Sequence, residues 1–357
     1  MELLELLQGM VELEAPDLIL KVGARPTVRA RGGLQQLGEQ EVTRDFNLRV
    51  VATLLDDRRM EQFVRGSEID IAYEVAGLSR FRVNLFHQLG MPAAVFRHIK
   101  SEVPSFEQLG LPADQLRKLC SLRRGLILTT GVAGSGKSTT LASMIEYMNL
   151  KQARHIVTIE DPIEFMFCDR NSIINQREVG SDTQDFQTAL KYALRQAPDV
   201  LVIGEMRDRS TVEAAISAAE TGHLVLSTFH TTNASQTIER VQSFFPDFQH
   251  NLIRLQLSMV LAGILSLRLI NRADGQGRLP AIELLLPTPT IREVLKQGKT
   301  DELDKALRQD TFFGTMTFLQ SLQELYNSGK ISYNDAVAAA DNPDELKLAL
   351  AGVSRGL

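Results

Sequence analysis

The first 110 residues combine helical periodicity with short segments in which apolar and polar residues alternate. Apolar side chains recur at helical spacing in residues 1–14, and residues 44–64 also have a helical pattern. The segments that predict strands are residues 17–23, 26–33, 69–75 and 80–86. The last two flank a turn at Ala76-Gly77 and predict a hairpin. This pattern indicates a small α+β domain that ends near residue 110.

From Gly125 the pattern changes to short, continuous apolar runs. These runs are "GLILTTG", "HIVTIED", "DVLVIGE" and "HLVLSTFH". Segments long enough for helices, such as residues 137–150 and 210–219, separate them. Continuous apolar strands that alternate with helices predict a parallel sheet covered on both faces. After about residue 288 the pattern is mostly helical. We therefore expect an α/β fold, with domains at residues 1–110 and 111–288 and a helical region at residues 289–357.

One apolar run raises the question of a membrane span. The run from Leu255 to Leu267, between Arg254 and Arg268, is shorter than the roughly 20 residues that cross a bilayer. We interpret it as a buried helix. The N-terminus lacks the basic region and cleavage site of a signal peptide. The sequence thus predicts a cytoplasmic protein that reaches a membrane only through a partner.

Composition narrows the function classes. The chain of 357 residues has a formal net charge of −5, whereas proteins held to nucleic acid by phosphate contacts are usually basic. Direct nucleic-acid binding is therefore not expected. The two cysteines, Cys120 and Cys168, are far apart in sequence and predict neither a disulfide framework nor a zinc cluster.

A phosphate-binding motif follows the first apolar run. The stretch "GVAGSGKST" fits the pattern GxxxxGK[ST], and it lies between a predicted strand and a predicted helix. Glycine backbone N–H groups and the helix N-terminus can hold phosphates, while Lys137 reaches the β- and γ-phosphates and Ser138 binds Mg²⁺. The residues expected to bind ATP are Gly131, Gly134, Ser135, Gly136, Lys137, Ser138 and Thr139.

Acidic residues follow two further predicted strands. Glu205 ends "DVLVIGE", where a carboxylate can hold Mg²⁺ beside the nucleotide. Asp199 precedes the same strand, about 20 Å away, and cannot serve. After "HIVTIED", the acids Glu160, Asp161 and Glu164 are all candidates for the carboxylate that orients and deprotonates water. The pattern alone does not choose among these three.

Two of the six histidines bracket one predicted strand in "ETGHLVLSTFHTTNA". His230 follows the carboxyl end of the strand, where ligands of parallel sheets bind, and it can sense the γ-phosphate. His223 precedes the strand by about 23 Å, so the two cannot contact the same phosphate. We therefore expect different roles for them.

Arginines in the first domain are candidates for the charge that an ATPase needs at the γ-phosphate. In "SRFRVNLFH", Arg80 and Arg82 face the side of the strand opposite to Phe81 and Val83. Arg97 follows on the next predicted strand. From the pattern alone, a solvated polar face is the favoured interpretation of these arginines.

Together these residues resemble the secretion ATPases, and specifically the type IV pilus retraction ATPases of the PilT/PilU kind. The motifs that carry the resemblance are "GVAGSGKSTT", "IVTIEDPIEF", "NQREVGSDT", "LRQAPDVLVIGEMRD" and "AAETGHLVLSTFHTTNA". The runs "REVGSDT" and "ALRQAPDV" are more similar to the PilU branch, whereas "TIREVLKQGK" matches part of a PilT signature.

The resemblance implies a PAS-like N-terminal domain, a RecA-like C-terminal domain, and a homohexamer with ATP between the domains. It selects Glu164 as the catalytic glutamate and Glu205 as the Walker-B acid. The other residues that match family positions near the nucleotide are His223, His230, Arg80, Arg82, Arg97 and Arg278. It also implies an inner-membrane pilus platform protein as partner, work at the cytoplasmic face of that membrane, and a paralogous retraction ATPase as a further partner.

Three other functions compete with this interpretation. A pilus-assembly or type II secretion ATPase would carry a four-cysteine zinc site and a longer N-terminal region. A nucleic-acid motor would have a basic channel. An accessory subunit with low turnover would keep the same fold. A measurement of ATPase activity with and without DNA, beside a mass measurement of the oligomer, is the experiment that best narrows these alternatives.

Overall fold

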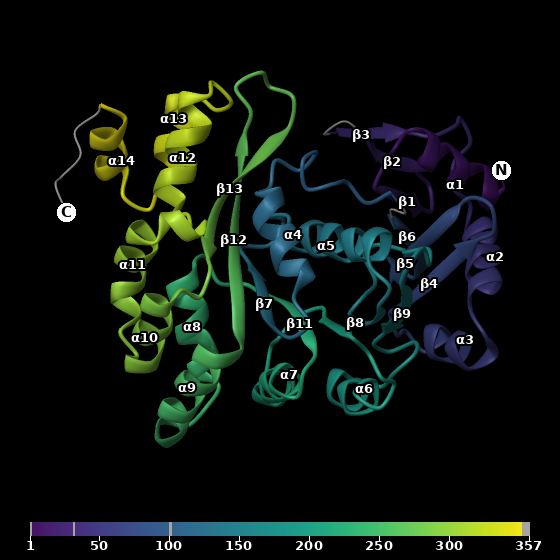
Figure 1. Ribbon diagram of the computed structural model, residues 1–357. Coiled ribbons are helices and arrows are strands. Elements are labelled where there is room, and N and C mark those ends of the chain that lie inside the picture. The colour runs from purple at the N-terminus through teal and green to yellow at the C-terminus, as the bar shows by residue number, and fades with distance from the viewer. Residues whose placement is uncertain (1, 31–32, 100–101, 352–357) are drawn as a thin grey trace. The chain divides into compact units, whose positions relative to one another are not determined.

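The computed structural model describes residues 2–30, 33–99 and 102–351, and the chain forms two compact units (Figure 1). The N-terminal unit comprises Met1–Glu102 together with the short segment Ile163–Met166. The C-terminal unit comprises Val103–Pro162 and Phe167–Leu357. Each unit has its own sheet and its own apolar core.

The N-terminal unit is an antiparallel sheet of six strands in the order β3-β2-β1-β6-β5-β4. Its strands are β1 (Asp17–Lys21), β2 (Thr27–Ala30), β3 (Gly33–Gln36), β4 (Ile69–Val75), β5 (Ser79–Gln88) and β6 (Met91–Ile99). Its helices are α1 (Leu3–Glu12), α2 (Arg44–Leu54) and α3 (Asp57–Val64). The predicted hairpin is present as β4 and β5. Residues 31–32 of the predicted second strand lie outside the described residues.

The C-terminal unit has a sheet of seven strands in the order β13-β12-β7-β11-β10-β8-β9. Its strands are β7 (Gly125–Thr130), β8 (His155–Glu160), β9 (Ile173–Glu178), β10 (Val200–Ile203), β11 (Leu224–Phe229), β12 (Leu261–Asn271) and β13 (Arg278–Leu285). The four apolar runs read from the sequence are β7, β8, β10 and β11, and they lie side by side in parallel. Only β13 runs antiparallel to its neighbour.

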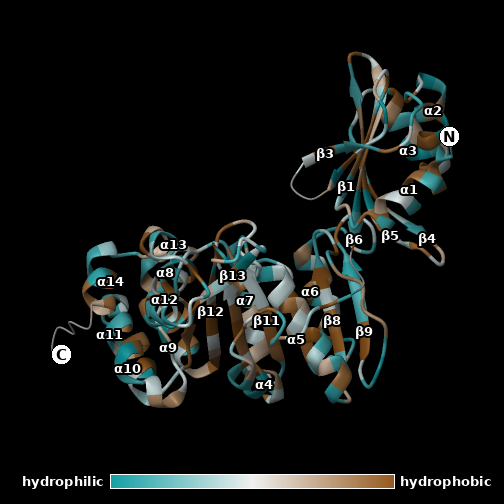
Figure 2. Ribbon diagram, turned by 90° about the horizontal axis from the view of Figure 1, so that it is seen from above, coloured by the Kyte–Doolittle hydropathy of each residue, from teal (hydrophilic) through white to brown (hydrophobic). Residues whose placement is uncertain are grey.

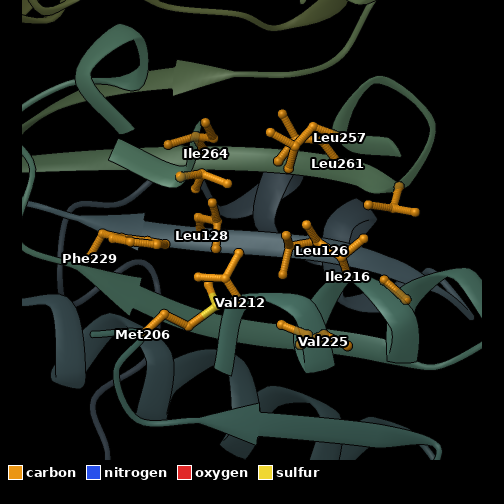
Figure 3. Close-up of a cluster of buried hydrophobic side chains, with 14 of the residues drawn as sticks. Leu126, Leu128, Met206, Val212, Ile216, Val225, Phe229, Leu257, Leu261 and Ile264 are labelled. Atoms are coloured by element: carbon orange, nitrogen blue, oxygen red, sulfur yellow. The ribbon is translucent and has the colours of Figure 1, made fainter. Parts of the chain in front are cut away.

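Helices cover both faces of this sheet. Successive residues of a strand point to opposite faces, so one strand contributes to two apolar clusters. Leu126 and Leu128 of β7 join one apolar cluster, and Ile127 joins another. Figure 3 shows the first cluster, in which Val212 and Ile216 of a covering helix lie among the strand residues. The helices up to the last strand are α4 (Ala113–Ser121), α5 (Lys137–Lys151), α6 (Phe186–Ala193), α7 (Arg209–Glu220), α8 (Ala234–Ser243), η1 (Asp247–Gln249) and α9 (His250–Val260).

The last part of the described chain is helical, as the pattern predicts. Its helices are α10 (Pro289–Gln297), η2 (Thr300–Glu302), α11 (Leu303–Gln309), η3 (Thr311–Phe313), α12 (Phe318–Asn327), α13 (Tyr333–Ala339) and α14 (Pro343–Leu350). Helices α12, α13 and α14 contribute to a small core that includes Phe318, Leu322 and Leu346, whereas α10 and α11 pack in the first cluster. In Figure 2 these helices alternate between apolar and polar colours, as expected for elements with one buried face.

The prediction of one buried helix from Leu255 to Leu267 is wrong. Helix α9 ends at Val260, and the chain continues directly as strand β12 from Leu261. Leu255 and Met259 are 45% and 57% exposed, while the apolar side chains Leu261, Ile264, Leu265 and Leu267 of β12 are buried. A continuous apolar run does not reveal where helix gives way to strand.

Among the described residues, the helices are all too short or too polar to cross a membrane. The same ranges contain no cluster of three or more His, Cys, Asp or Glu side chains that could hold a metal ion. Cys120 is buried and Cys168 is exposed, and both are free thiols.

Candidate nucleotide-binding site

The carboxyl ends of β7, β8, β10 and β11 meet at one edge of the C-terminal sheet, because these strands are parallel. This edge is where ligands bind in open α/β sheets. The loop of residues 131–136 leaves β7 there and leads into α5. Glu205 follows β10 and His230 follows β11 at the same edge. The topology therefore gathers the predicted phosphate loop, acid and histidine.

The phosphate loop needs glycine at defined positions. Gly131, Gly134 and Gly136 have φ values of 144°, 74° and 97°, a region that other residues rarely adopt. Gly136 is also the N-cap of α5, so the first turn of that helix opens at the loop. Backbone N–H groups at a helix N-terminus bind anions. Ser135 is buried, and Ser138 and Thr139 are half-buried in the first turn.

Gly131→Ala is expected to disrupt this loop. A Cβ at residue 131 would lie 2.6 Å from the Leu267 carbonyl oxygen of β12, which cannot move without disturbing the sheet. Strained backbone of this kind costs about 1–3 kcal/mol. We expect the affinity for ATP, measured by titration with a fluorescent analogue, to fall by about tenfold or more. Gly134→Ala has a positive φ but open space around its Cβ, so it is the matched control, with a smaller loss.

Lys137 lies at the centre of the site. The residue is 8% exposed, and Nζ donates to the carbonyl oxygens of Gly131 (2.8 Å) and Val132 (3.0 Å). Nζ also lies 3.5 Å from Nδ1 of His230. An ammonium group only donates, so Nδ1 accepts and the imidazole proton is on Nε2.

His230 connects Lys137 to Glu205. The imidazole Nε2 lies 3.2 Å from Oε1 of Glu205, and Arg207 forms an ion pair of 2.8 Å with the other carboxylate oxygen. Partial burial opposes ionisation, but the hydrogen bonds from Arg207 and His230 and the charge of Arg207 together lower the pKa of Glu205. Glu205 is therefore ionised at neutral pH, as a ligand of Mg²⁺ must be.

The predicted acids after β8 have different environments. Oε1 of Glu160 accepts from the Thr158 hydroxyl (2.6 Å) and from the Gln176 amide (3.3 Å), which fixes it within the sheet. Asp161 is exposed at the end of the strand. Glu164 is also exposed, and it belongs to the segment Ile163–Met166 of the N-terminal unit.

The structure does not bring His223 to the phosphate loop. His223 precedes β11, and its carbonyl oxygen accepts from the N–H of Gly125 at the start of β7. Its Nδ1 lies 3.0 Å from the Ala218 carbonyl oxygen. His223 thus lies at the amino-end edge of the sheet, and His230 lies at the carboxyl-end edge.

The predicted arginines of the N-terminal unit share one face of its sheet. Arg82 and Arg97 are register partners on β5 and β6, and Arg82 and Arg80 alternate with buried residues of β5. Arg82 forms an ion pair of 3.5 Å with Asp70, and Arg97 one of 2.9 Å with Asp17. The Arg82–Asp70 pair is exposed and holds its guanidinium group only weakly, whereas the Asp17 side chain that pairs with Arg97 is 12% exposed.

Arg278 belongs to the C-terminal unit. It begins β13 and is exposed, opposite Asn271 at the end of β12. Ser266 of β12 is in register with Thr130 at the end of β7. Five further residues of β12 therefore place Arg278 about 17 Å beyond Thr130, on the side of the sheet edge where the phosphate loop lies.

Sequence reasoning missed two residues of this region. Arg207 holds Glu205, and its only signal is its position two residues after the acid. Glu283 is a single acid within the apolar run "AIELLL" and is 7% exposed. An isolated charge inside a predicted buried strand is a signal that could have been followed.

Residues 52–330 match the profile of the family described as "Type II/IV secretion system protein". The chain belongs to this family. It is 39% identical over 348 residues to the "Type IV pilus ATPase PilU" of Pseudomonas aeruginosa, covering 98% of this chain and 91% of that protein. It is also 39% identical over 344 residues to the "Type IV pilus retractation ATPase PilT" of the same species, covering 96% and 99%.

A solved member of this family has the same fold. The crystal structure of the pilus retraction motor PilT with bound ADP has a TM-score of 0.91 to this chain and is 42% identical, covering 97% of this chain and 99% of that one. The predicted resemblance to secretion ATPases and the predicted fold class are thereby confirmed. The equal identity of 39% to PilT and PilU does not separate the two branches.

Proposed function

We propose that this chain is an ATPase that hydrolyses ATP to power the retraction of type IV pili. One observation carries the proposal: Lys137, His230 and Glu205 form a connected group beside a phosphate-binding loop. The near full-length similarity to PilT and PilU supports it. The alternative of a type II secretion ATPase is less well supported, since one such relative from Xanthomonas campestris is 32% identical and this chain covers 47% of it.

Mg²⁺ is part of the proposed chemistry. The hydroxyl of Ser138 and the carboxylate of Glu205 are oxygen donors of the kind that Mg²⁺ prefers, and Glu205 is ionised. When bound, Mg²⁺ neutralises negative charge on the phosphates. The chain's own contribution is to hold these two donors at the same edge of the sheet, Ser138 at the start of α5 and Glu205 after β10.

The remaining roles are assigned by chemistry. Lys137 stabilises charge on the transferred phosphate, and His230 reads the γ-phosphate. Glu164 orients and deprotonates the attacking water. Arg80, Arg82 and Arg97 supply positive charge during transfer, and Arg278 contributes from β13. We propose that these residues act in a homohexamer at the cytoplasmic face of the inner membrane, against a pilus platform protein and beside a paralogous retraction ATPase.

The test combines activity and mass. The purified chain should hydrolyse ATP without stimulation by DNA, and its mass in the presence of nucleotide should be that of six copies. Its gene should restore twitching in a strain that lacks retraction, together with a partner ATPase if the chain is of the PilU kind. Hydrolysis that depends on DNA would contradict the proposal.

The two histidines should fail differently when replaced. His230→Ala removes the group between Lys137 and Glu205, so we expect hydrolysis to slow by about 10²-fold and the ratio of ATP to ADP affinity to narrow. His223→Ala acts at the other sheet edge and should leave that ratio unchanged. Isothermal titration of each variant with ATP and with ADP measures the two affinities and hence their ratio. A narrowed ratio in the His223 variant alone would reverse the assignment.

A further inference from the structure

Strand β13 carries one carboxylate in an otherwise apolar stretch. Glu283 is 7% exposed, and its neighbours Ile282 and Leu284 are buried. Burying a carboxylate costs free energy unless its oxygens are hydrogen-bonded. An acid at this position therefore calls for a reason other than packing.

Glu283 joins two elements of the nucleotide site. Its Oε1 accepts from the N–H of Ala234 at 2.6 Å and from the hydroxyl of Ser266 at 3.2 Å. Ala234 is the first residue of α8, where N–H groups lack partners within the helix and a negative charge is favourable. Ser266 of β12 is in register with Thr130, the residue before the phosphate loop. The carboxylate thus ties the start of α8 to the strand beside β7.

The start of α8 determines the course of the loop that carries His230. Three residues, 231–233, separate His230 from the helix. The Thr231 hydroxyl bonds to the Thr237 hydroxyl at 2.6 Å, and Asn233 caps the helix through the N–H of Gln236. Thr231 and Asn233 of the loop are thus both hydrogen-bonded to residues in the first turn of α8. A shift of that turn therefore moves the loop and His230 with it.

We propose that Glu283 is a positioning residue for ATP hydrolysis, which sets the place of His230 relative to Lys137 and Glu205 by holding the first turn of α8. The inference rests on the proposed function of the site, and it adds a residue that acts through the position of His230.

Glu283 also faces the C-terminal helices. It lines a cavity of about 280 Å³ together with side chains of α11, α12 and α14. The other acids of this cavity are paired with arginines: Asp304 and Glu345 with Arg308, and Asp341 with Arg268. Glu283 is held instead by the two donors on α8 and β12.

Burial raises the pKa of Glu283 to about 7, against the lowering effect of its two donors; the charge of Asp304 raises it further and that of Arg268 lowers it. Near neutral pH both forms of the carboxyl are therefore present. Each form keeps an oxygen that accepts from Ala234, and so does the amide of glutamine. The proposal accordingly needs an acceptor at this position and not a charge.

The test compares four variants with the wild type. Glu283→Ala and Glu283→Met remove the acceptor, and Met keeps the volume, so one of them should fold. Glu283→Gln keeps the acceptor. Ser321→Ala is the matched control, since it removes a buried hydrogen bond of 3.0 Å to the adjacent Ile282 N–H on the same strand.

We expect kcat to fall by about 10- to 100-fold in the two variants without an acceptor, with the Kd for fluorescent ADP nearly unchanged. Glu283→Gln and Ser321→Ala should stay within about twofold of wild type. Equal losses in Ser321→Ala and Glu283→Met, or wild-type kcat in folded Glu283→Met, would overturn the proposal.

If the wild type itself does not hydrolyse ATP, the proposed function fails. The affinities of the variants for ATP and ADP then still test whether Glu283 positions His230. In that case the ratio of ATP to ADP affinity must narrow in Glu283→Met and not in Glu283→Gln. An unchanged ratio in Glu283→Met would overturn the positioning role.

Discussion

Lys137→Ala is expected to lower kcat for ATP hydrolysis by about 10²- to 10³-fold and to weaken ATP binding. Lys137 is a buried residue, and its ammonium group donates to the carbonyl oxygens of Gly131 and Val132 in the phosphate loop. Alanine removes the ammonium donor from these two carbonyl oxygens and from Nδ1 of His230, while the Val132 oxygen keeps the N–H of Ser135 as a donor. Single-turnover hydrolysis and titration with an ATP analogue measure the two effects separately.

Lys151→Ala is the matched control, because Lys151 is the last residue of the same helix and is exposed. It should bind and hydrolyse ATP as the wild type does. Lys137→Arg tests whether charge alone is enough: the planar guanidinium is not interchangeable with a compact ammonium group. Near-normal hydrolysis by Lys137→Ala would show that the phosphate loop of this chain is not a site of catalysis.

The local sequence was sufficient to predict the buried parallel strands and the phosphate loop. The strands β7, β10 and β11 are buried at every position and β8 at its four inner positions, and the residues there are apolar or small, so the pattern identifies these strands directly. The phosphate loop is equally local, because glycine spacing alone determines its backbone. Parallel pairing then brings Glu205 and His230 to the loop without further information.

The sequence could not show what depends on partners distant in the chain. The change from α9 to β12 at Leu261 is set by pairing with β7, which no local period announces. Glu283 gains its role from Ala234, which is 49 residues away. Strand β9 was missed because its residues are mostly polar or only partly buried, as at the edge of a sheet.

Glu164→Gln is expected to lower turnover by about 10²- to 10⁴-fold while leaving ATP binding unchanged. A carboxylate can take a proton from the attacking water and an amide cannot, whereas the two groups have the same shape. Glu164 is exposed, so the substitution should not affect folding. The variant should therefore bind ATP, assemble as the wild type does, and fail only at the chemical step, which single-turnover hydrolysis detects.

The neighbouring acids provide the controls, because the sequence left three candidates open. Oε1 of Glu160 accepts from Thr158 and Gln176 within the sheet, and the amide oxygen of glutamine can accept the same two bonds, so Glu160→Gln should retain most turnover. Asp161→Asn changes an exposed residue at the strand end and should retain most activity. If instead Asp161→Asn abolishes turnover and Glu164→Gln retains it, the water is activated by Asp161. In that event the family match at Glu164 does not extend to its chemistry.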